Sequence, residues 1–373
     1  MKRKRKPYSQ PYPGPYCSKA GHAFITGAKT GVLLLNMGGP DGPESVKPFL
    51  LNLFSDPDIL KLPQLIQPWL ARYIVWKRGN EAIANYAKMP GGGSPQKALS
   101  WQQAQALEHT LNQQQQPVTT ALAMRYWHPL TQQALKTLLQ QGVCQLVVVT
   151  LYPHFSYTTT GSNLNELRRA LKETGWDGPL SIVAGYSQTD WYIKALAQCI
   201  QQGLNEGQWS CPQNQVHLLF SAHSLPVRHC KRTGDPYEQL TRQNAQAVMR
   251  QYFPTNPWDI GFQSKVGNFP WLGPPTDGVL AYYAGKRIDN VLVVPISFVS
   301  DHIETLVELD IDYLPEARQQ GIAHLHRAPV MNTEPAYIQG LASAIQASIQ
   351  QAMARAHPPE LSSSPMATCS AAL

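Results

Sequence analysis

A run of apolar residues at 291–294, followed at once by proline, is the feature that most constrains the fold. An unbroken apolar run of this length is typical of a parallel strand that is covered on both faces. Pro295 ends the strand, because proline cannot donate a ladder hydrogen bond. Ser300 or Asp301 can then cap a helix that we expect to begin near His302.

Three acids follow at intervals of four residues, Glu304, Glu308 and Asp312, and therefore share one face of the expected helix. Like charges at this spacing repel each other by on the order of 0.3 kcal/mol per pair. The row therefore favours a bound cation, a bound proton or a functional role. Asp301 and Glu304 also fit an N-terminal capping box, and the other two acids fit a solvated face. From these residues alone, both interpretations stay open.

The charge and length of the chain restrict the classes of function. A chain of 373 residues favours two domains, and a net charge of +7 favours acidic partners: anionic lipid, nucleic acid or a small substrate with carboxylates. The basic residues are scattered apart from a run at 2–6, and no nucleic-acid-binding signature accompanies them. We therefore expect no nucleic-acid partner.

The cysteines and the apolar segments bear on the compartment. The six cysteines are far apart and form no C-x-x-C pair, which favours a reducing environment. No stretch of 18 apolar residues is present, and no apolar segment follows the basic N-terminus as it does in a secretory signal. The sequence predicts a cytoplasmic protein without a spanning helix.

Strand-like and helix-like segments alternate along the chain, which predicts βαβ units and parallel sheets. The expected strands are 31–36, 118–125, 145–151, 180–185, 216–221, 258–263, 291–295 and 324–328, and the expected helices include 96–113, 130–141, 191–204, 237–252 and 334–355. The predicted division is a disordered basic, proline-rich arm (1–30), an N-terminal α/β domain (31–187), a C-terminal α/β domain (188–332), a terminal helix (333–355) and a disordered tail (356–373).

Residues 59–78 are apolar around more than half of a predicted helix, although Pro63 and Pro68 should start or break helical turns there. A core helix is one interpretation. A hydrophobic lip is the other, because tryptophan beside a basic end, Lys77 and Arg78, is typical of a helix that lies on a membrane surface. The residues of this segment favour neither the core helix nor the hydrophobic lip.

Several loops that follow the predicted strands carry polar and aromatic side chains, and ligands of open α/β sheets bind at such ends. His223, Arg125 and Trp271 are examples. Packing explains each of these alone. Together with the acidic row they suit a large flat aromatic ligand with carboxylates, and a metal. No P-loop or G-x-G-x-x-G frame fits, so we expect no nucleotide.

Eight motifs in one order make the sequence similar to the ferrochelatases. They are LLNMGGP (34–40), GGGSP (91–95), RYWHPLT (125–131), LYPHFS with TTTGS (151–162), FSAHSLP (220–226), GDPY (234–237), FQSKVGNFPWLGPPTD (262–277) and PISFVSDHIETLVELDIDY (295–313). The resemblance implies two Rossmann-like α/β domains with four-stranded parallel sheets and an active cleft between them. It also implies a lyase that inserts Fe²⁺ into protoporphyrin IX, the last step of haem synthesis.

The resemblance assigns roles to individual residues. It makes His223 and Glu304 the essential catalytic pair, and both would contact the metal. Supporting residues on the proton or metal path would be Asp301, His302, Glu308 and Asp312. The porphyrin-binding residues would be Met37, Arg125, Tyr126, Tyr152, Ser156, Trp271 and Phe298, with Arg125 able to pair with a propionate.

Many relatives carry a [2Fe-2S] cluster, which needs four cysteine ligands. Here the C-terminal tail has only Cys369, and Tyr157 stands at the remaining cluster position, so we expect no cluster. The expected partners are protoporphyrin IX, ferrous iron and the inner membrane surface, touched peripherally through residues 59–78. The sequence leaves monomer or homodimer open. A chelatase for coproporphyrin or cobalt is one alternative. A non-catalytic porphyrin carrier is another, but it would not need His223 together with Glu304.

Overall fold

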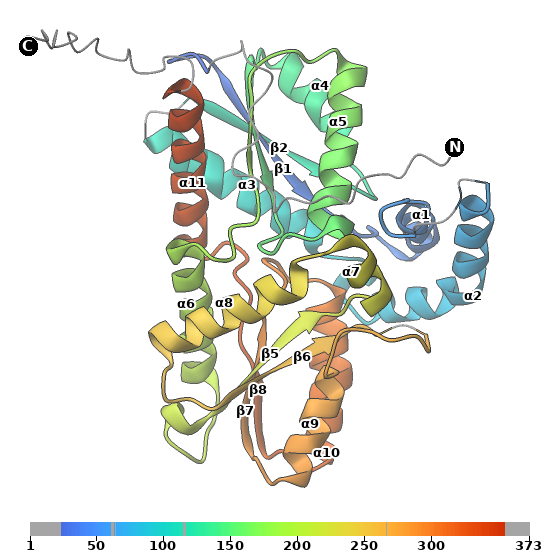
Figure 1. Ribbon diagram of the computed structural model, residues 1–373, viewed down its shortest axis with the longest axis vertical. Coiled ribbons are helices and arrows are strands. Elements are labelled where there is room, and N and C mark those ends of the chain that lie inside the picture. Colours follow the sequence, from blue (N-terminus) through green and yellow to red (C-terminus); the bar gives the residue numbers. More distant parts are fainter. Residues whose placement is uncertain (1–23, 61–62, 64, 115–116, 266, 355–373) are drawn as a thin grey trace, which may run out of the picture.

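The computed structural model describes residues 24–60, 63, 65–114, 117–265 and 267–354. They form two parallel four-stranded sheets, one from each half of the chain, with helices on their faces (Figure 1). The strand orders are β2-β1-β3-β4 and β6-β5-β7-β8, so the halves repeat one topology. The predicted fold class, two Rossmann-like parallel sheets flanked by helices, is confirmed.

The strands match the apolar runs of the sequence closely, because parallel strands covered on both faces must be apolar throughout. Every residue of β1 is buried, for example. The strands are β1 Thr30–Asn36, β2 Val118–Met124, β3 Gln145–Thr150, β4 Leu180–Val183, β5 His217–His223, β6 Trp258–Gln263, β7 Asn290–Pro295 and β8 His324–Arg327.

The helices include several that the sequence did not predict. The predicted ones are α3 Gln96–Gln113, α4 Thr131–Gln140, α6 Asp190–Glu206, α8 Tyr237–Tyr252 and α11 Pro335–Ala354. The additional ones are α1 Pro43–Phe54, α5 Ser162–Thr174, α7 Val227–Thr233, α9 Thr276–Gly285 and α10 Leu314–Gln319, with a short π-helix at Tyr157–Gly161.

One hydrophobic core joins the two halves. Its buried side chains come from β1 of the first sheet, from β5 of the second, and from α6 and α11, which contact each other at the left of the view in Figure 1. Close approach of these two helices depends on Gly340, where a Cβ atom would lie 2.2 Å from the Trp191 ring. The predicted boundary near residue 187 therefore separates the sheets but does not divide the core.

Both ends of the chain were predicted to be disordered. Disorder is wrong for residues 24–30, because Phe24 is buried in the core and the Ile25 amide donates to the side chain of Gln145. The rest of the arm and the tail at 356–373 lie outside the described residues. Among the helices that the structure describes, none is long and apolar enough to span a membrane.

The helix expected at 59–78 is displaced: α2 runs from Gln67 to Ala87. Pro68 occupies its first turn, where the missing N–H costs no hydrogen bond. The helix continues past the apolar pattern because Ala82, Ile83 and Tyr86 pack against Val307. Val307 belongs to a π-helix, Glu304–Tyr313, where the sequence predicted an ordinary α-helix.

Candidate active site

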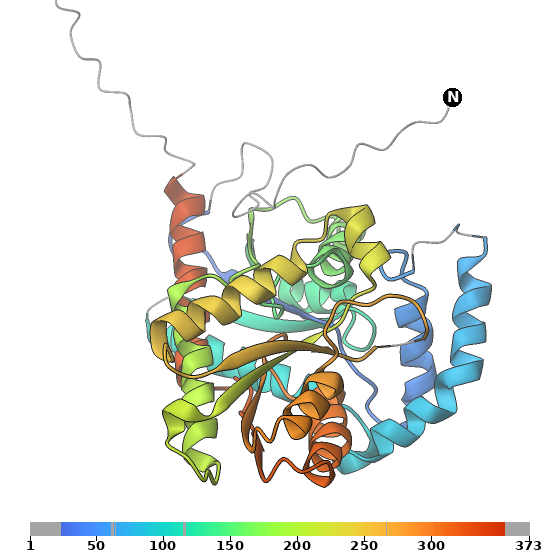
Figure 2. The same cartoon turned by 60° about the horizontal axis from the view of Figure 1, so that its bottom comes forward.

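A cavity of about 420 Å³ lies between the two halves of the chain. One wall is formed by α1, α2 and the loop after β1, and the other by the π-helix and the loop after β6. Figure 2 shows α1 and α2 standing apart from the sheets and facing the loop after β6. The lining includes Met37, His302, Glu304, Glu308 and Asp312, so all three acids of the predicted row face one space.

His223 and Glu304 meet beside this cavity. Nδ1 of His223 lies 2.9 Å from a carboxylate oxygen of Glu304. His223 ends β5, and the backbone N–H of His223 donates to Ser297, which follows the neighbouring strand β7. The chain reverses its winding direction between β5 and β7, which is the point where open α/β sheets bind ligands. The two side chains therefore lie where this fold places its chemistry.

His223 and Glu304 shift each other's pKa in opposite directions. Burial alone would lower the pKa of His223, but the charge and hydrogen bond of Glu304, with a smaller effect of Glu308, raise it above its ordinary value. Burial likewise opposes ionisation of Glu304, yet His223 and His302 hold the Glu304 pKa below its ordinary value. Each group thus stabilises the charged form of the other.

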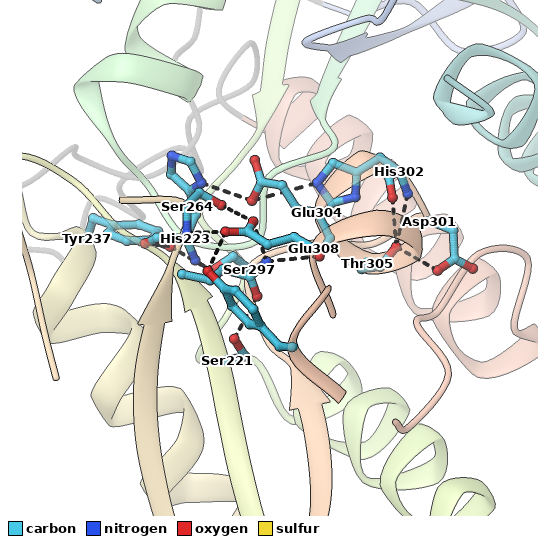
Figure 3. Close-up of polar contacts among 12 residues, drawn as sticks. Ser221, His223, Tyr237, Ser264, Ser297, Asp301, His302, Glu304, Thr305 and Glu308 are labelled. Carbon is cyan, nitrogen blue, oxygen red and sulfur yellow. Dashed lines mark hydrogen bonds and ion pairs between the residues drawn. The ribbon is translucent and has the colours of Figure 1, made fainter. Parts of the chain in front are cut away.

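Figure 3 shows Glu304 between two imidazole rings. On the side away from His223, Nε2 of His302 lies 4.0 Å from the same carboxylate oxygen. His302 is buried, and burial lowers its pKa. Neither of its ring nitrogens has a hydrogen-bond partner among the described residues. The ring of Phe298 packs against it with the ring centroids 4.0 Å apart.

Glu308 is held by more donors than any other acid of the row. Its carboxylate accepts hydrogen bonds from the N–H and hydroxyl of Ser264, from the Gln263 amide and from the Tyr313 hydroxyl. Ser264 has a φ of 67°, a strained conformation for a residue with a side chain. Burial and the neighbouring Glu304 nevertheless raise the pKa of Glu308. Glu308 therefore holds a proton more readily than Glu304.

The remaining supporting residues lie at the ends of the row. Asp312 forms an ion pair with Lys88 at 3.0 Å, which joins the end of α2 to the π-helix. Asp301 accepts a hydrogen bond from Thr305. The capping-box interpretation is wrong, because the π-helix begins after Ile303 without a side-chain cap and Glu304 contacts His223 instead.

Arg125 and Tyr126 are held by an acid that the sequence did not single out. Asp56 is buried and accepts hydrogen bonds from both, at 2.9 Å from Arg125 and 2.7 Å from the Tyr126 hydroxyl. Nε of Arg125 donates to Ser162. One edge of the guanidinium is therefore occupied, and Tyr126 is 1% exposed. Their roles in porphyrin binding stay predictions.

The other predicted porphyrin-binding residues lie at strand ends of both halves. Tyr152 follows β3, and its hydroxyl accepts from Asn163. Ser156 is buried and donates to Asp235, which belongs to the second half. Trp271 stacks on Phe269 with a centroid distance of 5.0 Å. Of this group, only Met37 is among the residues that line the cavity.

Two cations that line the cavity were not predicted as site residues from the sequence. Arg78 and Lys265 line the cavity. Arg78 was expected only at the basic end of the hydrophobic lip, and Lys265 was not singled out. No group of three or more His, Cys, Asp and Glu side chains within the described ranges is arranged to hold a metal ion. The contact of His223 and Glu304 with a metal stays a prediction. The expected absence of an iron–sulfur cluster stays a prediction, because Cys369 lies outside the described residues.

The pKa of His223 provides a test of this geometry in the metal-free protein. Glu304→Gln should move the His223 titration midpoint down, below the ordinary value of about 6.5, because burial then acts without the neighbouring charge. Glu308→Gln should move it less. NMR titration of the His223 ring protons measures both shifts. An unchanged midpoint in Glu304→Gln would contradict the pairing.

The sequence of this chain is similar to those of known ferrochelatases. A model of the ferrochelatase family matches residues 29–349. A ferrochelatase of Geobacter metallireducens is 42% identical over 319 residues, covering 85% of this chain and 98% of that protein. Ferrochelatase-2, chloroplastic, of Arabidopsis thaliana is 40% identical over 330 residues, covering 86% of this chain. The match spans 64% of the Arabidopsis protein.

A solved structure of SirB from Bacillus subtilis with Fe³⁺ superposes with a TM-score of 0.49 at 9% identity, covering 86% of this chain and 96% of that one. This likeness is too low to add to the argument. The family model and the two sequence relatives are sufficient, and they confirm the resemblance of the motifs: this chain belongs to the ferrochelatase family.

Proposed function

We propose that the protein inserts Fe²⁺ into protoporphyrin IX and releases two protons, a lyase reaction that forms haem in the last step of haem synthesis. The family implies a porphyrin and ferrous iron as substrates. The observation that supports catalysis most directly is the 2.9 Å contact between His223 and Glu304 at the edge of the cavity. A protein that only carried porphyrin would not need a paired base there.

Proton removal is the role that the geometry of His223 suits. Metalation requires two pyrrole N–H groups to lose their protons. In neutral His223, Nδ1–H donates to Glu304, which leaves the lone pair of Nε2 for a pyrrole proton. The imidazolium that forms is stabilised by the Glu304 carboxylate. The pair therefore accepts the positive charge that leaves the porphyrin.

The row of acids at 304, 308 and 312 is placed to carry protons or metal ions between His223 and solvent. Glu304, Glu308 and Asp312 line one cavity wall, and Asp312 is exposed to solvent. Since the Glu304 pKa is lowered and the Glu308 pKa is raised, a proton shared by the two carboxylates resides on Glu308 in preference to Glu304. Carboxylates with imidazole also suit weak, reversible contact with ferrous iron. We propose the row as the path for protons or metal.

Two cations at the cavity wall are candidates for binding the porphyrin carboxylates. Arg78 and Lys265 come from opposite sides of the cavity, α2 and the loop after β6. Arg125 is not among the residues that line the cavity, so the two wall cations are better placed for these carboxylates. We propose that they bind the propionates.

Anaerobic turnover of Fe²⁺ with protoporphyrin IX tests the proposal. The parent should form haem, and His223→Ala should lose about 100-fold or more in kcat because it lacks the base. His109→Ala, an exposed histidine of α3, is the matched control and should behave like the parent. Protoporphyrin dimethyl ester should show a higher KM, since it cannot pair with Arg78 and Lys265.

Three outcomes would change the proposal. A preference for coproporphyrin III over protoporphyrin IX would keep the chelatase and change its substrate. A preference for cobalt over iron would change its metal. Tight porphyrin binding without turnover in the parent would indicate a carrier, and the contact between His223 and Glu304 would then have no explanation.

A membrane surface is the proposed source of the porphyrin, and the place of action is the cytoplasmic face of the inner membrane. Apolar side chains at the start of α2 point to solvent: Trp69 is 73% exposed and Trp76 77%. Leu65, Ile66 and Tyr73 are also exposed. Arg72 lies over the Trp69 ring, and Lys77 follows Trp76. Exposed aromatic rings beside basic residues are typical of interfacial helices.

Flotation with liposomes that contain anionic lipid tests this surface. The parent should float, and Trp69→Ser with Trp76→Ser should reduce the bound fraction at least about tenfold, because two large apolar side chains no longer enter the interface. Trp101→Ser, which removes an exposed tryptophan of α3, is the control. Equal flotation of all three proteins would exclude α2 as the contact.

A further inference from the structure

We propose that Arg327 is a positioning residue that fixes the π-helix from behind, so that Glu304 and Glu308 keep their directions into the cavity. Arg327 is the last residue of β8 and is not among the residues that line the cavity. It acts through two acids, Asp310 and Asp301. The inference rests on the proposed function, because it assigns a role in metal insertion.

The contact with Asp310 is bidentate. Nε and one terminal nitrogen of Arg327 donate to the two carboxylate oxygens at 2.7 and 2.9 Å. Asp310 lies inside the π-helix, two residues after Glu308. The Arg327 side chain is 14% exposed, so water screens the pair weakly. A paired fork of this kind fixes orientation as well as distance.

The second acid precedes the helix. The other terminal nitrogen of Arg327 lies 3.4 Å from Asp301 and also donates to the carbonyl of Ala328. Asp301 accepts a hydrogen bond from Thr305, the second residue of the π-helix. Asn332 binds both the backbone N–H and the carboxylate of Asp301. One guanidinium thus ties the turn before the π-helix to the middle of the helix.

The contacts of Arg327 bear on the site because the acidic residues lie on a π-helix, whose geometry can change. Its hydrogen bonds join residues five apart, and this geometry is rare compared with the four-residue spacing of an α-helix. A change between the two spacings turns the later residues of the helix relative to the earlier ones. Glu304 and Glu308 would then leave their partners, His223 and Ser264. Because Asp301 and Asp310 bracket this segment, their shared contact with Arg327 opposes the change.

Three variants separate positioning from general stability. Arg327→Met removes the charge and keeps most of the volume. Asp310→Asn removes the inner partner, and its side chain is partly exposed, so it perturbs folding less. Arg318→Met is the matched control, since Arg318 donates to the backbone carbonyl of Leu325 on the same strand. Hydrogen exchange and anaerobic kinetics are measured for each, with circular dichroism as the check of folding.

In Arg327→Met, hydrogen exchange of peptides covering 304–313 should become faster, while it stays at the parent rate in Arg318→Met. With protoporphyrin IX and Fe²⁺, kcat should fall about 10-fold to 100-fold, and KM for the porphyrin should stay within about twofold, because the porphyrin-binding wall is intact. The double variant Arg327→Met with Asp310→Asn should lose no more than Arg327→Met alone.

Unchanged exchange in the π-helix, or faster exchange with parent kcat, would overturn the proposal. So would equal losses of kcat in Arg327→Met and Arg318→Met, which indicate a general loss of stability. A parent without turnover would instead contradict the proposed function. The exchange measurement does not depend on turnover and would still decide whether Arg327 holds the helix.

Discussion

A single oxygen of Glu304 lies 2.9 Å from Nδ1 of His223 and 4.0 Å from Nε2 of His302, and the surrounding structure serves to keep it there. A partly buried carboxylate such as that of Glu304 is costly unless it is paired, because burial opposes every charge. The pairing lowers the pKa of Glu304 and raises that of His223, so each group offsets the burial of the other. The catalytic proposal depends on this balance.

The second sheet brings the pair together from separate stretches of chain. His223 ends β5, whereas Glu304 begins the π-helix that follows β7, and the strands are neighbours in the second sheet. The first half supplies the opposite wall through α1 and α2. The two walls also touch directly, because Val46 of α1 and Tyr86 of α2 share a small hydrophobic cluster with Val307 of the π-helix.

The sequence was sufficient for the strands and for the central pair. Unbroken apolar runs predict buried parallel strands, and His223 and Glu304 stand in long motifs beside such runs. The additional helices and the displaced start of α2 were not predicted, since their limits depend on tertiary contacts such as Tyr86 with Val307. The π-helix has the same acidic spacing as an α-helix and cannot be distinguished by pattern.

Side-chain contacts between residues far apart in the chain also could not be predicted from the sequence. Asp56 and Arg125 are 69 residues apart, and Arg327 meets Asp310 from another element. Neither pair has a local sequence signal. The same holds for Arg78 and Lys265, which share a cavity only because the halves face each other. Motif resemblance indicated the residues that we propose for the chemistry, whereas the residues that hold them were found only in the structure.

The central claim is that His223 and Glu304 act as one unit in removing protons from the porphyrin. A double-mutant cycle tests it most directly: the rate of Fe²⁺ insertion is measured in single turnover for the parent, His223→Ala, Glu304→Gln and the double variant. The account predicts that the double variant is no slower than His223→Ala, since Glu304 acts through the imidazole. Rate losses that multiply would show independent roles and would contradict the claim.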